Sequence, residues 1–431
     1  MSVLFENVTA VLMDDARTVL SNAYVAVEGT GISYVGTEKP EGTFDEVIDA
    51  SGKVMMPGFV NAHTHVPMTL MRGYGGGTNL QTWLNDYIFP AEAKWDDRSI
   101  RAATTLGLAE MITSGVTCIA DMYMRCDAII EETLAAGISA NISCGSVFFG
   151  ETFSPEACSD CGVQEKLAET WHGHNGGQIL IDASIHGEYT SKPGLWKWTA
   201  DFARANGLGM HVHLSETRSE HEACIARHGM TPAAVFEKHG VFDGRAIAAH
   251  CVYTTPEDWA ILAGHGVSAI HNPMSNLKLG SGIAPIANLR KAGVNVGLGT
   301  DGVSSNNATD LFADMKLAAL LSCGSTCDPM ATNAWDALEM ATVHGGKALG
   351  RKTGRIALGY VADLILVDFT KPNLIPCHDV AENLVYSAHG ADVCLNMARG
   401  KVIYKDGQFL TIDMERIRRE LDEYAMPHIF G

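Results

Sequence analysis

The sequence is short of positive charge. Its 431 residues include 31 Lys and Arg against 50 Asp and Glu, so the formal net charge is −19. No basic stretch offsets this excess, and binding to the phosphate backbone of a nucleic acid depends on such a stretch. We therefore expect no nucleic-acid partner, and solubility is the simplest consequence of the negative charge.

Long hydrophobic runs and a disulfide framework are also absent. No segment approaches 18 uninterrupted apolar residues and no cleavable apolar run precedes Asp14, so neither a membrane span nor a signal peptide is expected. The 11 cysteines are odd in number and irregularly spaced, which does not fit a set of paired disulfides. Cys158 and Cys161 form an isolated Cys-x-x-Cys, whereas a zinc ribbon needs a second such pair. These features are typical of a reduced, cytoplasmic enzyme.

The hydrophobic content of 46% supports a large core. The chain has three regions that differ in their pattern of apolar and polar residues, here called texture. Residues 1–57 form short alternating β-prone segments separated by tight turns. Residues 354–431 return to this texture, with a hairpin signal at Asp406-Gly407, and end in a charged helical segment, MERIRRELDEYA. We expect the two ends to assemble into one small β-sandwich domain beside a larger domain over residues 58–353.

The central region alternates β-prone runs with amphipathic helical segments, which is typical of βαβ units and a parallel sheet. Eight such runs follow one another: VMMPGFVNA, GVTCIADM, GISANISC, QILIDASIH, LGMHVHL, AIAAHCV, VSAIHN and VNVGLGT. Eight parallel strands with intervening helices make a (β/α)8 barrel. The expected fold is therefore α/β, a TIM-like barrel that carries the small β domain.

Two histidines stand at the end of the first of these strands. His63 and His65 are two residues apart, and residues with this spacing project from the same face of a strand. A shared metal ion is the natural use of such a pair, because imidazole nitrogen binds zinc and neighbouring transition metals. A His-x-His pair alone is a weak signal, so the other strand ends decide the matter.

Further polar residues stand at the ends of the later strands, where the chemistry of a (β/α)8 barrel gathers. These residues are His186, His211, His213, Glu216, His250, His271 and Asp301. The sequence has 17 histidines, and their concentration at strand ends indicates a metal site. His63, His65, His213 and Asp301 make a plausible zinc set, with a water on the metal as the reactive species.

The roles of the remaining strand-end residues are less sharply defined by spacing. His211 shares a face with His213, so spacing leaves both open as ligands, and the pattern favours His211 as a packed residue one layer deeper. Glu216 is placed to shuttle protons, the alternative being a carboxylate that stabilises a helix N-terminus. His250 is expected to orient the reactive water or to stabilise charge. His186 and His271 are expected to face the substrate, the alternative for each being a buried hydrogen-bonded histidine.

The glycine run Gly73–Gly77 is not a phosphate loop, because no Gly-Lys-Ser/Thr follows it. It precedes a predicted helix, LQTWLNDYIF. A mobile lid beside the pocket and an ordinary flexible loop are the two interpretations of this run.

Five stretches, in chain order, resemble the amidohydrolase superfamily and, more narrowly, its 5-methylthioadenosine/S-adenosylhomocysteine deaminase group: PGFVNAHTH, HLSE, AAHCV, HNPMSNLKLGSGIAP and LGTDG. The resemblance covers nearly the whole chain and implies one zinc ion, with Fe²⁺ or Mn²⁺ as alternatives. Its implied ligands are His63, His65, His213 and Asp301. It assigns proton transfer to Glu216 and His250, with Asp301 accepting a proton from the metal-bound water. A lysine that would be carboxylated to bridge two metals is missing from the fourth strand end, where His186 stands.

The same resemblance implies the substrate contacts. Glu92, in FPAEAKW, matches the position that grips the ribose hydroxyls, and His186 matches one that contacts the purine. The stretches that correspond to the homocysteine-binding arginines read NISCGSV and CSDCGVQEK, without arginine, and the usual His-x-Pro-Tyr is replaced by HGEY. The expected substrate contacts are Glu92, His186, Glu216 and Asp301. The missing arginines and the altered HGEY motif favour a nucleoside with a small or uncharged 5′ group over S-adenosylhomocysteine.

Three functions follow from these observations. The first is hydrolytic deamination of an adenosine-type nucleoside, namely 5-methylthioadenosine, 5′-deoxyadenosine or adenosine, with S-adenosylhomocysteine less favoured. The second is deamination of a free base or pterin, such as guanine or 8-oxoguanine, or hydrolysis of an s-triazine. The third is a non-catalytic scaffold, against which the intact ligand set argues. We further expect a small-molecule purine nucleoside as substrate, no membrane partner and a homo-oligomer.

Overall fold

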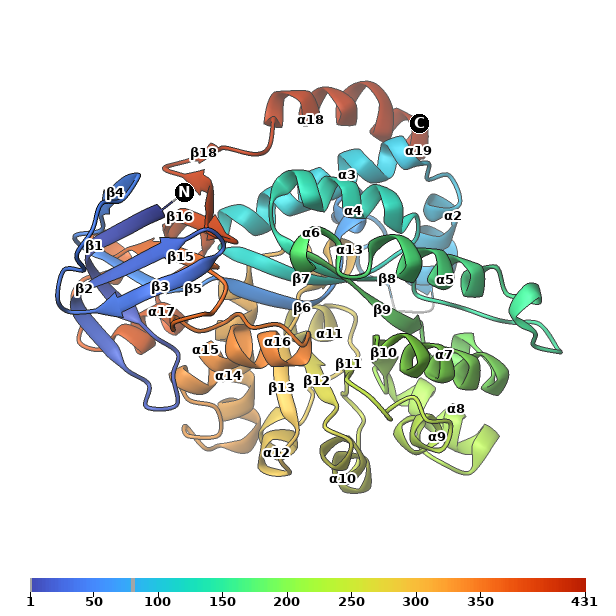
Figure 1. Ribbon diagram of the computed structural model, residues 1–431. Helices are drawn as coiled ribbons and strands as arrows, with labels where there is room; N and C mark the ends of the chain where they lie inside the picture. Colours follow the sequence, from blue (N-terminus) through green and yellow to red (C-terminus); the bar gives the residue numbers. More distant parts are fainter. Residues whose placement is uncertain (1, 79–81) are drawn as a thin grey trace.

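A computed structural model of the chain describes residues 2–78 and 82–431 and contains two sheets, each of nine strands (Figure 1). One sheet is parallel throughout and occupies the middle of the chain, whereas the other joins strands from both ends. Among the described residues, no helix is long and apolar enough to cross a membrane.

The parallel sheet contains a strand from each of the eight β-prone runs. The first run is divided, however, because its residues 54–57 belong to β5 (Lys53–Pro57) of the other sheet and the barrel strand begins at Phe59. In chain order its strands are β6 (Phe59–His65), β7 (Val116–Met122), β8 (Ser139–Ser143), β9 (Ile179–Ile185), β10 (Gly209–Leu214), β11 (Ala246–His250), β12 (Ser268–His271), β13 (Asn295–Leu298) and β14 (Asp301–Gly302). Neighbours in sequence are neighbours in the sheet from β6 to β13, and β14 pairs with β6. Because β13 leads directly into β14, the path returns to its first strand. The predicted parallel α/β arrangement is confirmed.

The eighth β-prone run forms β13, and a separate short strand, β14, follows it after Gly299 and Thr300, where the sequence predicts one strand that ends at Asp301. A Cβ atom on Gly299 would lie 2.5 Å from Asn272 Oδ1 and 2.8 Å from the His63 carbonyl oxygen, so only glycine fits there. Thr300 exchanges two hydrogen bonds with the Asn61 side chain, at 2.8 and 2.9 Å. The division fixes β14, which begins with Asp301, against the first barrel strand.

Helices alternate with the strands and cover the outer side of the parallel sheet (Figure 1). The main ones are α3 (Asp97–Thr113), α4 (Cys126–Ala136), α5 (Ser159–Trp171), α7 (Pro193–Asn206), α8 (Arg218–His228), α9 (Pro232–Lys238), α10 (Pro256–Gly264), α12 (Ile286–Lys291), α14 (Leu311–Thr326), α15 (Ala334–Ala341) and α16 (Val343–Ala348). Thr217 and Thr255 cap α8 and α10 with reciprocal capping boxes, which satisfy backbone N–H groups at the helix starts. The helices bury their apolar sides against the sheet in one large core.

The second sheet joins the two ends of the chain. Its strands are β1 (Ser2–Val11), β2 (Val19–Glu28), β3 (Gly31–Gly36), β4 (Glu46–Asp49), β5 (Lys53–Pro57), β15 (Leu364–Asp368), β16 (Val393–Ala398), β17 (Lys401–Lys405) and β18 (Gln408–Phe409). The antiparallel pair β5–β15 connects the N-terminal strands to the C-terminal ones. The predicted hairpin is confirmed, because β17 and β18 pair antiparallel and Asp406 and Gly407 have φ of 47° and 82°.

The C-terminal helical segment, α18 (Met414–Glu420) to α19 (Met426–Phe430), returns across the outside of the barrel (Figure 1). Arg98 pairs with Glu420 at 2.7 Å, and Lys94 donates to the carbonyl of Ile429 at 2.8 Å. The helix predicted over 80–89 continues in the structure as η2 (Trp83–Ile88) and α2 (Phe89–Glu92), and residues 79–81 lie outside the described part. The C-terminal segment therefore supports the stretch of chain that follows Glu92.

We expect Gly345→Ala to destabilise the fold. Gly345 lies in α16 against β6, and an added Cβ would meet Val60 Cβ at 2.7 Å and the Val60 carbonyl oxygen at 3.1 Å. Extra volume in a packed core costs about 1–3 kcal/mol, so the free energy of unfolding in urea should fall by that amount.

Gly324→Ala is the matched control, because Gly324 is exposed in α14 and an added Cβ meets nothing within 4 Å. Alanine there should stabilise the protein by about 0.5–1 kcal/mol through helix propensity. Equal unfolding free energies for the two variants would contradict the close packing of α16 on β6.

Candidate metal centre and active site

The polar strand ends converge at the carboxyl side of the parallel sheet. β6 supplies His63 and His65, β10 supplies His213, β11 supplies His250 and β14 supplies Asp301. The backbone adopts the left-handed conformation at two of these residues, since His250, the last residue of β11, and Asp301, the first residue of β14, have φ of 74° and 62°. Such conformations cost about 1–3 kcal/mol each and persist where the surrounding structure fixes them, which is characteristic of functional sites.

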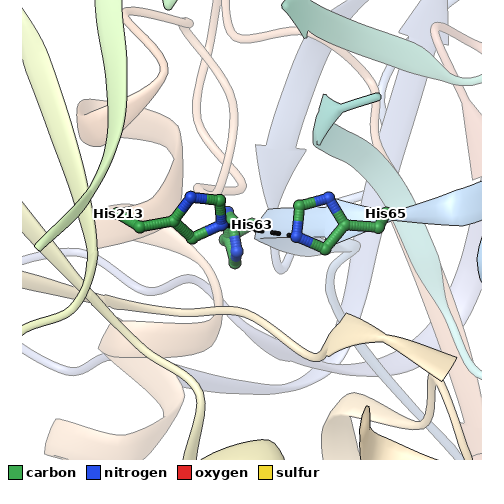
Figure 2. A group of neighbouring side chains, drawn as sticks. All are labelled: His63, His65 and His213. Carbon is green, nitrogen blue, oxygen red and sulfur yellow. Dashed lines mark hydrogen bonds between the residues drawn. The ribbon is translucent and has the colours of Figure 1, made fainter. Parts of the chain in front are cut away.

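Two overlapping groups of side chains bring their donor atoms together. His63, His65 and His213 form one group, and His63, His250 and Asp301 form the other, with the ligand atoms of each group within 4.8 Å of one another. Figure 2 shows the rings of His65 and His213 facing each other, with His63 between them. The Nε2 atoms of His65 and His213 are 3.4 Å apart, so one ion could contact both.

Hydrogen bonds on the far side of these rings fix their tautomers. His65 Nδ1 donates to the Met122 carbonyl at 2.5 Å, and His213 Nδ1 donates to the His186 carbonyl at 2.6 Å. A neutral imidazole that donates through Nδ1 carries a lone pair on Nε2. The lone pairs of His65 and His213 therefore point at each other, an arrangement that is unfavourable unless a cation lies between them.

His63 is oriented by His211, which lies behind it as expected for a residue one layer deeper. His63 Nδ1 is 2.8 Å from His211 Nε2, and His211 Nδ1 is 3.2 Å from Ser143 Oγ. With protons on both Nδ1 atoms, each of these contacts is a hydrogen bond, and the lone pair of His63 Nε2 points toward the site. That nitrogen is buried and has no hydrogen-bond partner among the described residues. This donor set fits a transition-metal ion.

Asp301 completes the ring of donors. Its Oδ2 accepts hydrogen bonds from Ser275 Oγ at 2.6 Å and Ser305 Oγ at 3.0 Å, which leaves Oδ1 3.4 Å from His63 Nε2 and 3.2 Å from His65 Nε2. Its Oδ1 therefore faces the Nε2 lone pairs of both rings in a buried space, which favours a cation between them. The site therefore contains a buried anion that attracts positive charge.

Glu216 and His250 lie beside this cluster. Glu216 Oε1 accepts a hydrogen bond from Ser281 Oγ at 3.2 Å, and its Oε2 is 3.9 Å from His250 Nε2. His250 Nδ1 is 2.9 Å from Asn276 Oδ1, so it donates there and turns Nε2 toward the cavity. Burial raises the pKa of Glu216. A carboxyl group with a raised pKa is suited to exchange protons with a bound molecule.

Glu220 holds the backbone that carries Glu216. Its carboxylate accepts hydrogen bonds from the N–H groups of Ser215 and Glu216, both at 2.9 Å, and it forms the capping box of α8 with Thr217. The carboxylate at the helix N-terminus is thus Glu220, so that alternative for Glu216 is wrong. The motif Thr217-x-x-Glu220 is a recognisable capping signal, although sequence analysis did not single it out.

A cavity of about 490 Å³ opens from the cluster. Its polar end contains His65, His186, His213, Glu216, His250 and Asp301. Its apolar walls include Met68, Trp83, Ile88, Met124, Phe149 and Leu279. Glu92 lines the cavity and accepts a hydrogen bond from Tyr123 at 2.6 Å, a partner that the sequence did not reveal. The volume is in the range that holds a small organic molecule.

The two histidines expected to face the substrate differ in position. His186 lines the cavity, its Nδ1 is 3.1 Å from Thr190 Oγ1, and burial lowers its pKa to about 4. His271 is buried and is not among the cavity-lining residues, and neither of its ring nitrogens has a hydrogen-bond partner among the described residues. The expectation that His271 faces the substrate is therefore not met by this geometry.

Comparison with known proteins identifies the class of protein to which this site belongs. A family model described as the amidohydrolase family matches residues 54–403. Because the match spans most of the chain, the chain belongs to the amidohydrolase family. The resemblance seen in the sequence motifs is thereby confirmed.

Individual relatives narrow the comparison. A 5′-deoxyadenosine deaminase of Methanosarcina mazei is 38% identical over 423 residues, which cover 98% of this chain and 97% of that protein. A 5-methylthioadenosine/S-adenosylhomocysteine deaminase of Moorella thermoacetica is 41% identical over 404 residues, which cover 93% of this chain and 94% of that protein. A solved adenosine deaminase from Xanthomonas campestris with bound zinc has a TM-score of 0.92 and 30% identity, with 98% of both chains covered.

We expect the purified protein to hold close to one equivalent of zinc or a similar divalent ion per chain. Chelation should lower the melting temperature, because the facing lone pairs of His65 and His213 then lack the cation that joins their strands. Elemental analysis and thermal unfolding before and after metal restoration measure both effects.

His65→Ala should reduce the metal content well below one equivalent. His378→Ala, which changes an exposed histidine remote from the strand ends, should leave the metal content at the wild-type value. A metal-free wild-type protein whose stability does not respond to added zinc would contradict the assignment of a metal centre.

Proposed function

We propose that this chain is a metal-dependent hydrolytic deaminase that converts an adenosine-type nucleoside and water into the inosine analogue and ammonia. The observation that carries the proposal is the single cavity that joins the histidine–aspartate cluster, Glu216 and His250 at one end to Glu92 on its wall. The names of the relatives from Methanosarcina mazei and Moorella thermoacetica support the same reaction class.

The residues that would hold the metal are His63, His65, His213 and Asp301. Their convergent lone pairs support zinc, and the zinc-bound adenosine deaminase structure supports it further. A bound ion of this kind would supply an activated water at neutral pH. The chain's own residues then have to orient that water and move protons.

Glu216 is proposed to deliver the proton that addition requires. Attack of water at the amine-bearing ring carbon builds negative charge on the adjacent ring nitrogen, and an acid must reach that atom. Burial raises the pKa of Glu216, which favours the protonated form that can donate. The Ser281 hydrogen bond and the Glu220 contacts to the backbone hold the carboxyl group in the cavity.

Asp301 and His250 are proposed to complete the proton transfers. Asp301 accepts a proton from the attacking water and returns it to the leaving amine, so that ammonia departs. The proton of the added hydroxyl group passes to Glu216 as the carbonyl oxygen of the inosine analogue forms. His250 turns the lone pair of Nε2 toward the cavity, where it can accept a hydrogen bond from the attacking water and orient it. Water is consumed, ammonia is released and both carboxyl groups return to their starting states.

Glu92 and His186 are proposed to position the nucleoside. Glu92 can accept hydrogen bonds from the two ribose hydroxyls, because Tyr123 satisfies its Oε1 and the other oxygen remains available. His186 presents a neutral imidazole to the purine, since burial lowers its pKa to about 4. Among the described residues that line the cavity, none is Lys or Arg, which supports a substrate without a carboxylate at its 5′ end.

We also propose that the chain divides into a barrel over 58–353 and a small β-sandwich domain formed by 1–57 and 354–431. A separate hydrophobic cluster supports this division, because it combines Phe5 and Met55 with Leu364 and Leu395. The β5–β15 pairing gives the same grouping of the two chain ends.

We expect Glu216→Gln to retain metal and to lose turnover by about 10²-fold or more, because glutamine keeps the shape but carries no transferable acid proton. Ammonia release from adenosine-type nucleosides measures the loss, and elemental analysis measures the metal. Glu169→Gln, at an exposed position of α5, should keep wild-type turnover. Near-normal turnover in Glu216→Gln would transfer the acid role to His250.

We expect 5-methylthioadenosine, 5′-deoxyadenosine or adenosine to be deaminated with higher kcat/KM than S-adenosylhomocysteine. A buried carboxylate needs a cationic partner, best a bidentate arginine, and the described lining of the cavity has no Lys or Arg.

Glu92→Ala should lower kcat/KM for nucleosides far more than for free adenine in the same ammonia-release assay, because adenine has no ribose for Glu92 to bind. A clear preference for S-adenosylhomocysteine would contradict the proposal that the substrate has no carboxylate at its 5′ end. Turnover of free bases, pterins or s-triazines in place of nucleosides would favour the alternative function within the same family.

A further inference from the structure

Asp160 is a carboxylate of the cavity that the proposed mechanism leaves without a role. It lines the cavity together with Gly145, Val147 and Phe149, which follow β8, whereas the donors of the histidine–aspartate cluster come from β6, β10, β11 and β14. The Phe149 side chain is 70% exposed, so this part of the wall borders the opening to solvent. A substituent that extends from the substrate away from the metal centre toward solvent passes along this wall.

The position of Asp160 is fixed by the surrounding structure. It lies in the first turn of α5, and its Oδ2 accepts a hydrogen bond from the Val147 backbone N–H at 3.0 Å. The cysteines on either side, Cys158 and Cys161, are buried in a cluster with Phe148 and Leu195. The carboxylate is therefore attached to a packed part of the wall and is not carried by a freely moving surface side chain.

No cationic side chain of the described residues pairs with the Asp160 carboxylate. Within residues 2–78 and 82–431, no Lys, Arg or His forms an ion pair with it, and Oδ1 has only the Ser159 hydroxyl at 3.5 Å. None of the described residues that line the cavity is Lys or Arg. A group that approaches this wall therefore meets a negative charge that no cationic side chain balances, in a partly apolar setting where electrostatic effects are larger than in bulk water.

We propose that Asp160 determines charge selectivity at the 5′ end of the substrate. It admits nucleosides whose 5′ group is neutral, favours those that carry a protonated amine, and rejects those that carry a carboxylate. This inference rests on the proposed nucleoside deamination and adds to it a specific discriminating residue, beyond the mere lack of a cationic partner.

A series of three nucleosides that differ in 5′ charge tests the proposal. Adenosine is neutral, 5′-amino-5′-deoxyadenosine is cationic, and adenosine-5′-carboxylate is anionic at neutral pH. Wild-type kcat/KM should be highest for the amine and at least about tenfold lower for the carboxylate than for adenosine, which corresponds to about 1.4 kcal/mol. Added salt should narrow this spread, because it screens charge.

Asp160→Asn removes the charge and keeps an oxygen that can accept the Val147 hydrogen bond. The ratio of kcat/KM for the carboxylate to that for the amine should rise by at least about tenfold. Glu165→Gln removes one charge from an exposed position of the same helix and should leave that ratio unchanged.

Three results would overturn the proposal. One is a wild-type enzyme that prefers the carboxylate or shows no salt-dependent spread, a result that needs no variant to fold. Another is an Asp160→Asn enzyme that deaminates adenosine normally with the wild-type charge ratio. The third is an equal shift in Glu165→Gln, which would assign the effect to the overall negative charge. Absence of turnover with all three nucleosides overturns the proposed function itself.

Discussion

Three imidazole lone pairs and one carboxylate oxygen converge on the same small volume, and the rest of the site depends on this convergence. Each donor is turned inward by a partner behind it: the Met122 and His186 carbonyls hold two rings, His211 holds the third, and two serine hydroxyls hold Asp301. Without a cation the arrangement would place lone pairs against one another in a buried space. The hydrogen-bond partners behind the donors therefore indicate a site for a cation.

The barrel maintains this convergence because the donors come from strands that are neighbours in the ring or separated by a few others. The division of the last strand is part of that geometry, since Gly299 lets the chain pass close to the His63 carbonyl before Asp301 turns inward with φ of 62°. The strain of such turns is offset by the packing of the whole barrel. Metal binding and the stability of the barrel are thus coupled, because an ion that joins β6, β10 and β14 also joins distant parts of the chain.

Sequence reasoning succeeded where a short-range rule determines the structure. The period of two in a strand places His63 and His65 on one face, and the Asp406-Gly407 turn is favoured by residues that accept positive φ. Sequence reasoning failed where contacts between residues far apart in the chain determine the local structure. The division of the eighth strand depends on Asn61 and Asn272. Similarly, the first turn of α5, which begins at Ser159, has a polar sequence and is held by the buried cysteines Cys158 and Cys161, which pack in a cluster.

The electrostatics of the cavity separate two requirements that would otherwise conflict. Asp301 supplies a negative charge that attracts a metal, whereas burial raises the pKa of Glu216, which favours its neutral form. His186 stays neutral for the same reason, as burial lowers its pKa to about 4. A neutral purine that contacts Glu216 and His186 then meets no fixed charge of either sign at these two side chains. Charge selection is left to the distant wall, where Asp160 stands, so substrate choice can change there without disturbing the chemistry at the strand ends.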